Sequence, residues 1–262
     1  MKIDLKGKNA LVCGSTKGIG LAIAKQFAAL GANVTMMSRN GALLERMVRD
    51  LPCEDGQKHD ILVADFSKPE QVKQAIEEKI QAHYSYQILV NNSGGPSPGP
   101  VLNAKEEEFL GAFNAHLLSS HFLVQGVVNG MKQSGYGRII NIISTSVKIP
   151  LKGLGVSNTI RGAVASWSKT MATELAPMGI TVNNILPGAT STDRLKQIIE
   201  GKALKQNEEV EAVNQEMLSE IPMNRFAKPE EIAFTAAFLA SEYAAYITGI
   251  NVPVDGGRTG SL

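Results

Sequence analysis

The strongest constraint on the fold is an alternation of short apolar runs with segments of helical period. Between the runs, apolar residues recur on one helix face, as do Val72, Ile76 and Ile80. The runs are almost continuously apolar, as in strands buried on both faces of a parallel sheet. They cover residues 10–13, 33–37, 61–64, 87–90, 138–143, 180–186 and 250–254. The alternation predicts an α/β fold with one doubly wound parallel sheet of about seven strands and helices on both faces.

Charge and composition narrow the class of protein. The 262 residues carry 26 basic and 25 acidic side chains, which gives no electrostatic case for a nucleic-acid or acidic-membrane partner. Two cysteines, Cys13 and Cys53, cannot form a disulfide framework or a four-ligand zinc site, and we expect no metal. No apolar run approaches the ~20 residues of a membrane span, and no signal peptide is visible. We therefore expect a soluble cytoplasmic protein with a single domain over residues 1–262.

One segment, residues 189–222, departs from the alternation. It is long, charged and helix-prone, and it lies between two predicted strands. Ligands of doubly wound sheets bind at the carboxyl ends of the strands. We therefore predict that this segment is a substrate lid over that end of the sheet.

A glycine-rich turn follows the first predicted strand. Its spacing is G-x-x-x-G-x-G, and a helix follows. Glycines permit a tight turn and close approach to a pyrophosphate, which the positive end of the following helix also attracts. Taken alone, the pattern could be an ordinary glycine-rich turn. The strand before it and the helix after it favour a dinucleotide site formed by Gly14, Ser15, Thr16, Lys17, Gly18, Ile19 and Gly20.

The end of the second predicted strand indicates which dinucleotide binds. An acid at this point would accept hydrogen bonds from an adenosine 2′-hydroxyl. The sequence has Ser38 and Arg39 instead, and Lys17 adds a second cation. Two solvated surface cations would be the alternative interpretation. Two cations without a carboxylate favour the 2′-phosphorylated cofactor, NADP(H).

Further motifs resemble the short-chain dehydrogenase/reductase family over nearly the whole chain. They are Asp65-Phe66, Asn91-Asn92-Ser93-Gly94, Pro187-Gly188 followed by Thr192, and a tail that includes Arg225–Ala233 and Val254-Asp255-Gly256-Gly257. The tail looks like the 3-oxoacyl-carrier-protein-reductase-like branch. The resemblance implies a Rossmann-type fold, NADP(H), a small-molecule carbonyl or alcohol substrate, and a homo-oligomer (dimer or tetramer). It also implies cofactor contacts from Asp65, Phe66, Asn92, Gly94, Arg161, Pro187, Gly188, Thr190 and Thr192.

The catalytic positions depart from the family pattern. The family uses a serine, a tyrosine thirteen residues later, a lysine four residues beyond it, and an asparagine in the preceding helix. The matching positions hold Ser144, Ser157, Arg161 and His116. A serine hydroxyl is a far weaker acid than a phenol, and an arginine is a poor proton donor. His116 is the residue in this set whose usual pKa lies near neutrality, so we expect it to titrate there.

Three interpretations remain open. In the first, the protein is an active NADP(H)-dependent oxidoreductase in which Ser144 and Arg161 polarise the carbonyl, and His116 or water supplies the proton. In the second, it binds NADP(H) with little turnover and serves as a sensor, scaffold or partner subunit. In the third, Ser157 and Arg161 only fill space and His116 is a structural helix histidine.

Overall fold

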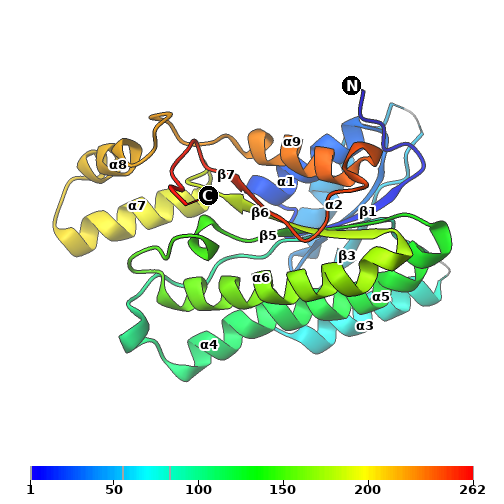
Figure 1. The fold of residues 1–262 in the computed structure, drawn as a ribbon, viewed down its shortest axis with the longest axis horizontal. Coiled ribbons are helices and arrows are strands. Elements are labelled where there is room, and N and C mark those ends of the chain that lie inside the picture. Colours follow the sequence, from blue (N-terminus) through cyan, green and yellow to red (C-terminus); the bar gives the residue numbers. More distant parts are fainter. Residues whose placement is uncertain (1, 55, 83, 262) are drawn as a thin grey trace.

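The computed structural model describes residues 2–54, 56–82 and 84–261. In this part of the chain a seven-stranded sheet forms in the order β3-β2-β1-β4-β5-β6-β7, with every neighbouring pair parallel. The predicted doubly wound sheet is confirmed (Figure 1). The strands are β1 (Asn9–Cys13), β2 (Asn33–Ser38), β3 (Asp60–Val63), β4 (Ile88–Asn91), β5 (Gly137–Ile142), β6 (Ile180–Pro187) and β7 (Asn251–Val254).

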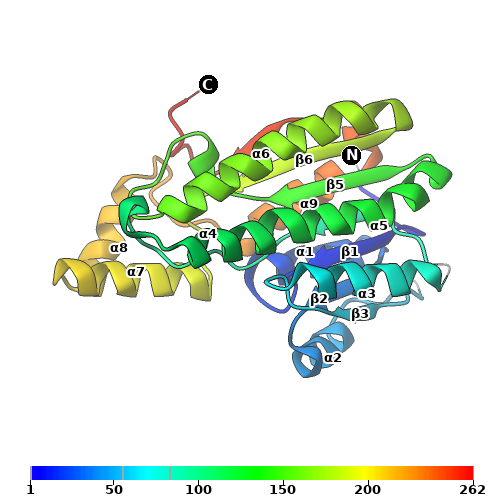
Figure 2. The ribbon, with the colours of Figure 1, turned by 90° about the horizontal axis from the view of Figure 1, so that it is seen from below.

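Helices cover both faces of this sheet, as Figures 1 and 2 show. On one face lie α1 (Gly18–Ala29), α2 (Gly41–Arg49) and α9 (Pro229–Ala240); on the other lie α3 (Pro69–Gln81), α5 (Ser119–Ser134) and α6 (Gly155–Leu175). The alternation of side chains along a strand produces the two layers. In β1, Ala10 and Val12 pack in the core that holds α1 and α9, whereas Leu11 and Cys13 pack in the opposite core. β1 is therefore buried on both sides, as are β4 and β5, which suits their apolar sequences, whereas the outer strands β3 and β7 are only partly buried.

Four asparagines cross the sheet in register. Asn91 donates to Asn141 at 2.8 Å, Asn141 donates to Asn184 at 2.9 Å, and Asn184 donates to Asn251 at 2.8 Å. The pairs are direct neighbours in the parallel register of β4, β5, β6 and β7. This asparagine ladder satisfies the amides of Asn141 and Asn184 in the middle of an apolar sheet, whereas the Oδ1 of Asn91 has no partner among the described residues, and it fixes the relative height of the strands that carry the candidate site.

The helical segment over residues 106–134 is interrupted. The structure has α4 (Glu106–Phe113), then a π-helical turn (Asn114–Leu118), then α5. The backbone N–H of Ser119 donates to the carbonyl of Asn114, five residues earlier. The hydroxyl of Ser120 donates to the carbonyl of His116 at 2.8 Å, which satisfies an acceptor in the irregular turn. Periodicity alone does not reveal one extra residue in a helical turn.

The segment predicted as a lid forms α7 (Asp193–Gln206) and α8 (Val210–Ser219), which project beyond the end of the sheet (Figure 1). These helices have an apolar cluster of their own, built from Leu195, Ile199, Ala203 and Val213. At the base of the segment, Ser191 and Ala227 are joined by a backbone hydrogen bond of 2.8 Å. The segment is therefore anchored near its start and separately packed beyond it.

Two loops beyond the carboxyl ends of β4 and β5 are joined by backbone hydrogen bonds. Gly99 donates to Gly153 at 2.7 Å and accepts from Gly155 at 3.1 Å. Short 3₁₀ turns occur at Val101–Asn103, Thr145–Val147, Ala176–Met178 and Glu242–Ala244. Within the described residues, no helix is both long and apolar enough to cross a membrane.

Candidate active site

The strand order reverses direction between β1 and β4, and ligands of such sheets bind beyond the strand ends at this point. The glycine turn follows β1 here. A Cβ on Gly14 would lie 2.8 Å from the carbonyl oxygen of Asn92, and one on Gly20 would lie 2.3 Å from the carbonyl oxygen of Gly14. Gly18 has φ +55°, a conformation that L side chains rarely adopt. The turn therefore requires glycine at all three positions.

Side chains that we expected to contact the cofactor also brace this turn. The amide of Asn92 donates to the carbonyls of Cys13 and Gly14 at 3.2 and 3.3 Å. The hydroxyl of buried Ser15 accepts from the backbone N–H of Met37 at 3.0 Å. Asn92 thus ties the turn to the end of β4, and Ser15 ties it to β2. Their predicted contacts with the cofactor remain predictions.

The residues around α1 fit a dinucleotide. Lys17 is the N-cap residue of α1, no side chain caps this terminus, and the first turn contains no acid. The amino end of the helix therefore keeps its positive potential for a pyrophosphate. Thr16 and Ile19 lie in the same turn and the first turn of the helix.

The cations expected at the 2′-phosphate differ in their surroundings. Arg39, just after buried Ser38, is exposed and has no ion pair within the described residues. Burial acts to raise the pKa of nearby Asp65, but hydrogen bonds from Ser67 and the charges of Arg39 and Lys68 outweigh it, so this pKa is lowered. Lys17 instead lies 3.8 Å from Asp193 of α7, with both side chains exposed. Arg39 is therefore the better placed of the two cations for a 2′-phosphate.

The remaining expected cofactor residues lie along the same strand ends. The backbone carbonyl of Phe66 accepts from Ser119, and Gly94 is exposed in the loop that follows β4. After Pro187, the last residue of β6, Gly188 lies so close to Asp255 that a Cβ would approach its backbone to 2.8 Å.

The start of the segment predicted as a lid contacts the glycine turn. The hydroxyl of Thr190 donates to the carbonyl of Gly188, and the hydroxyl of Thr192 donates to the carbonyl of Thr190. Thr192 also caps α7 by accepting from Leu195. A Cβ on Gly18 would lie 3.2 Å from the methyl group of Thr192. The segment after β6 is therefore in contact with the turn predicted to hold the pyrophosphate.

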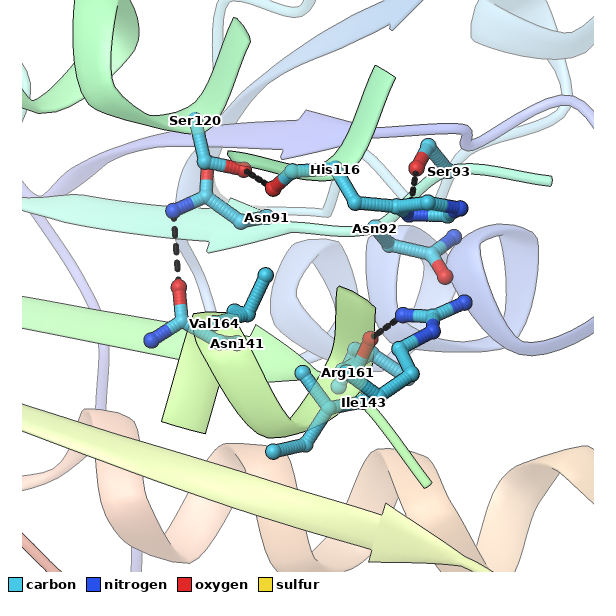
Figure 3. Close-up of a pocket in the computed structure, with 10 residues that line it drawn as sticks. Asn91, Asn92, Ser93, His116, Ser120, Asn141, Ile143, Arg161 and Val164 are labelled. Atoms are coloured by element: carbon cyan, nitrogen blue, oxygen red, sulfur yellow. Dashed lines mark hydrogen bonds between the residues drawn. The ribbon is translucent and has the colours of Figure 1, made fainter. Parts of the chain in front are cut away.

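A small cavity lies where β4, β5, α6 and the π-helical turn meet (Figure 3). His116 and Arg161 both line it, which confirms that the fold brings these two predicted residues together. Ser144 and Ser157 are not among its lining residues. The lining consists of Asn91, Asn92, Ser93, His116, Ser120, Asn141, Ile142, Ile143, Arg161 and Val164.

The guanidinium of Arg161 is buried in this cavity. One terminal nitrogen donates to the carbonyl of Ile142 at 2.7 Å, whereas the buried Nε has no partner in the described chain. Burial and the charge of Arg194 lower the pKa of Arg161 to about 10. Arg161 therefore remains a cation at neutral pH, with an unused donor inside the cavity.

His116 forms a pair with a residue that we did not assign from the sequence. Its Nδ1 lies 2.6 Å from the hydroxyl oxygen of Ser93, and its buried Nε2 has no partner in the described chain. Burial and the charge of Arg161 lower the pKa of His116 well below its usual value. The expectation that His116 titrates near neutrality is therefore wrong, because the buried imidazole is neutral at pH 7. The sequence signal for Ser93 was its place in the Asn91-Asn92-Ser93-Gly94 motif.

The two serines expected to be catalytic have other surroundings. Ser144 caps the 3₁₀ turn after β5, and its hydroxyl accepts from the backbone N–H of Ser146 at 3.1 Å. Ser157 lies one turn before Arg161 in α6 and is partly exposed, and its hydroxyl has no hydrogen bond to any described residue. Their catalytic roles remain predictions.

No tyrosine replaces the missing phenol. All five tyrosines of the chain lie in described segments that lead into the amino ends of strands, away from the carboxyl ends that form the cavity. The hydroxyl of Tyr86 donates to Thr35 at 3.0 Å, and that of Tyr136 donates to the carbonyl of Ala240. The remaining tyrosines are Tyr84, which precedes β4, and Tyr243 and Tyr246, which precede β7.

Arg194 is a second site residue that sequence reasoning missed. It lies in the first turn of α7, is partly buried, and donates to the carbonyl of Pro96 at 2.5 Å. This bond connects α7 to the loop after β4. The position belongs to the segment where we expected substrate specificity, but no known motif marks the arginine itself.

Comparisons with known proteins agree with this architecture. Residues 14–259 match the family described as Enoyl-(Acyl carrier protein) reductase. The chain is 34% identical to the 3-oxoacyl-[acyl-carrier-protein] reductase FabG of Pseudomonas aeruginosa, covering 97% of this chain and 98% of that protein. It is 32% identical to the NADPH-dependent reductase BacG of Bacillus subtilis, covering 97% and 99%. The L-sorbose reductase of Gluconobacter frateurii, solved with NADPH and L-sorbose, superposes with a TM-score of 0.93 at 33% identity and complete coverage of both chains. The chain belongs to the short-chain dehydrogenase/reductase family, in its 3-oxoacyl-carrier-protein-reductase-like branch.

Proposed function

We propose that this protein is an NADP(H)-dependent oxidoreductase that interconverts a carbonyl and an alcohol on a small-molecule substrate. The observation that carries the proposal is the His116–Ser93 pair, which shares one cavity with the cationic Arg161. The uncapped amino end of α1, the exposed Arg39 and the NADPH-dependent relatives support the choice of cofactor.

In this proposal Arg161 and His116 have different roles in the reaction. NADPH, when bound, supplies the hydride. The cation of Arg161 polarises the substrate carbonyl and stabilises negative charge that develops on its oxygen. When the Nδ1 of His116 accepts a hydrogen bond from Ser93, its Nε2 carries the hydrogen and can donate it to that oxygen.

Ser93 provides a route for replacing the donated proton. As Nε2 gives up its proton, Nδ1 takes the hydroxyl proton of Ser93, and the partly exposed Ser93 takes a proton from water, which leaves as hydroxide. The imidazole is then the Nδ1–H tautomer, and it returns to the Nε2–H form before the next turnover. The imidazole therefore gives one proton to the substrate and receives one through Ser93, and it does not become a cation in this relay. This relay suits a histidine whose burial disfavours the cation.

A second candidate function is NADP(H) binding with little turnover, as in a sensor, scaffold or partner subunit. It is favoured by the position of Ser157, which has no acidic proton where the family has a phenol. One terminal nitrogen of Arg161 also already donates to the carbonyl of Ile142, which leaves fewer donors for a substrate oxygen.

The Ser93→Ala substitution tests the relay. We expect kcat for carbonyl reduction to fall by about 10²-fold, within the usual range for losing positioned proton transfer, while the Kd for NADPH stays constant. Stopped-flow absorbance at 340 nm measures turnover, and NADPH fluorescence measures binding. Ser166→Ala is the matched control, because Ser166 is exposed on α6.

The outcomes separate the candidates. An unchanged kcat in the Ser93→Ala protein contradicts the relay. Tight NADPH binding with background turnover across a broad carbonyl panel favours the sensor or scaffold. Ser144→Ala belongs in the same series, since a large loss of kcat would place that serine in the reaction.

A further inference from the structure

Two arginines approach the candidate active site without an acidic partner. Arg161 is buried in the cavity and has an unpartnered Nε. Arg194 extends from the first turn of α7 to the carbonyl of Pro96. Neither side chain forms an ion pair with any residue in the described ranges. Within the described residues, therefore, neither positive charge is neutralised by an acid: that of Arg161 lies in the cavity, and that of Arg194 lies beside it at the loop after β4.

The two charges lie close enough to act on each other. The charge of Arg194 contributes to the lowered pKa of Arg161. The loop that Arg194 contacts continues from Asn92 and Ser93, which line the cavity together with Arg161. Like charges in a partly buried cleft repel each other, and a buried cation without a counterion is costly. An anion bound between them would relieve both costs.

Nearby acidic side chains do not neutralise these two arginines. Asp193 faces Lys17 rather than Arg194. Glu107 and Glu108 line a separate cavity of about 250 Å³, which lies between the loop after β4 and α4 and touches His116. Both glutamates are exposed, and neither contacts an arginine of the pair.

The phosphates of the cofactor have other candidate binding groups. The amino end of α1 is free for the pyrophosphate, and Arg39 is free for a 2′-phosphate. Within the lid, Thr192 and Asp193 contact the glycine turn, whereas the next residue, Arg194, contacts the opposite loop at Pro96. Arg194 therefore lies against Pro96, a residue that lines the cavity of about 250 Å³ that also touches His116.

We propose that Arg161 and Arg194 bind a carboxylate of the substrate, and that the protein acts on oxo- or hydroxycarboxylic acids. This inference rests on the proposed oxidoreductase function and names its substrate class. Arg161 also polarises the reacting carbonyl, so the carboxylate must lie one or two carbon atoms from it. An arginine presents several N–H donors in one plane, which suits such a pair of oxygen acceptors.

The first test measures binding in the NADPH-loaded protein. Oxalate and malonate are titrated by calorimetry against the wild type and the Arg194→Met variant, with oxamide and malonamide as uncharged counterparts. We expect the diacids to bind and the diamides not to bind. We expect Arg194→Met to weaken diacid binding by about 10- to 100-fold, the effect of losing a charge-assisted hydrogen bond. Lys196→Met is the control, because Lys196 lies in the same helix turn but faces solvent.

The second test measures turnover with 2-oxo and 3-oxo acids and their amides. We expect kcat/KM to favour the acids, and Arg194→Met to remove that preference mainly through KM. Equal turnover of acids and amides in the wild type overturns the carboxylate site while leaving the oxidoreductase function standing. Loss of NADPH affinity in Arg194→Met, with diacid binding unchanged, also overturns it, since the arginine would then serve the cofactor. If the wild type does not bind NADPH, the proposed function itself fails.

Discussion

At the scale of single residues, the proposed mechanism replaces a phenol by a buried imidazole. A phenol with a pKa near 10 can exchange a proton once a neighbouring cation lowers that pKa, and an aliphatic hydroxyl at the same position cannot. The residue at that position, Ser157, is therefore a poor substitute. His116 reaches the cavity from the π-helical turn, and the hydroxyl oxygen of Ser93 lies 2.6 Å from its Nδ1. The proton-transfer function has, in our proposal, moved from α6 to the π-helical turn.

The buried state of His116 predicts how stability depends on pH. Its folded pKa is lowered below the unfolded value near 6.5, so above pH 6.5 the group is neutral in both states. Below pH 6.5 His116 binds a proton in the unfolded chain but not in the folded chain, so the free energy of unfolding falls as the pH falls. When the pH is lowered from 7.5 to 5.5, we expect the free energy of unfolding, measured in urea, to fall by about 1 kcal/mol more in the wild type than in His116→Gln. Parallel losses in the two proteins would contradict a buried neutral imidazole.

The exposed Arg39 predicts how cofactor choice can be changed. Arg39→Asp replaces a cation with a group that repels a 2′-phosphate and accepts hydrogen bonds from a 2′-hydroxyl. We expect the Kd for NADPH to rise by about 100-fold and the Kd for NADH to fall, as measured by fluorescence titration. The control is Arg49→Asp, an exposed arginine in the last turn of α2. Unchanged NADPH affinity in Arg39→Asp would assign the 2′-phosphate to another residue.

At the scale of elements, two features decide where the site residues lie. The π-helical turn adds a residue to a helical turn, so residues before and after it no longer follow one helical period. His116 lies within that turn, and its carbonyl is satisfied by the Ser120 hydroxyl. The asparagine ladder holds β4 and β5 side by side, and the cavity opens where these two strands end.

The centre of the ladder predicts a loss of stability. Asn141 accepts from Asn91 and donates to both Asn184 and Ser168. Asn141→Ala leaves buried polar partners unsatisfied, so we expect the free energy of unfolding to drop by about 3 kcal/mol. Urea denaturation measures this drop against Asn103→Ala, an exposed asparagine in a 3₁₀ turn. Similar values for the two variants would mean that the ladder adds nothing to stability.

At the scale of the whole molecule, large apolar side chains remain exposed in two groups of elements. Leu102 is 92% exposed and Leu110 53% exposed in the region of α4, and Phe234 and Tyr246 are exposed on and after α9. Large apolar side chains that stay exposed occur where subunits meet. The expected homo-oligomer stays a prediction.

Sedimentation equilibrium tests the oligomer. We expect a mass of two or four times 28.0 kDa for the wild type. Leu102→Asp and Tyr246→Asp should each lower the mass if their surfaces are interfaces, because a charge cannot be buried there without a partner. Glu107→Asp, which keeps the charge of an exposed side chain near Leu102, is the control. A wild-type mass of 28.0 kDa at all concentrations contradicts the prediction.

The sequence by itself determined the sheet, the glycine turn and the family, because these depend on patterns that are local in the chain. Apolar runs indicate strands that are buried on both faces, and the glycine spacing indicates a turn in which backbone atoms approach one another closely. Only the tertiary structure decided what surrounds each polar side chain. Ser93 meets His116 across 23 positions, and Arg194 meets Pro96 across 98. A pKa or a free donor depends on such distant neighbours, so the neutral state of His116 and the unpaired arginines could not be obtained from residue types and their spacing.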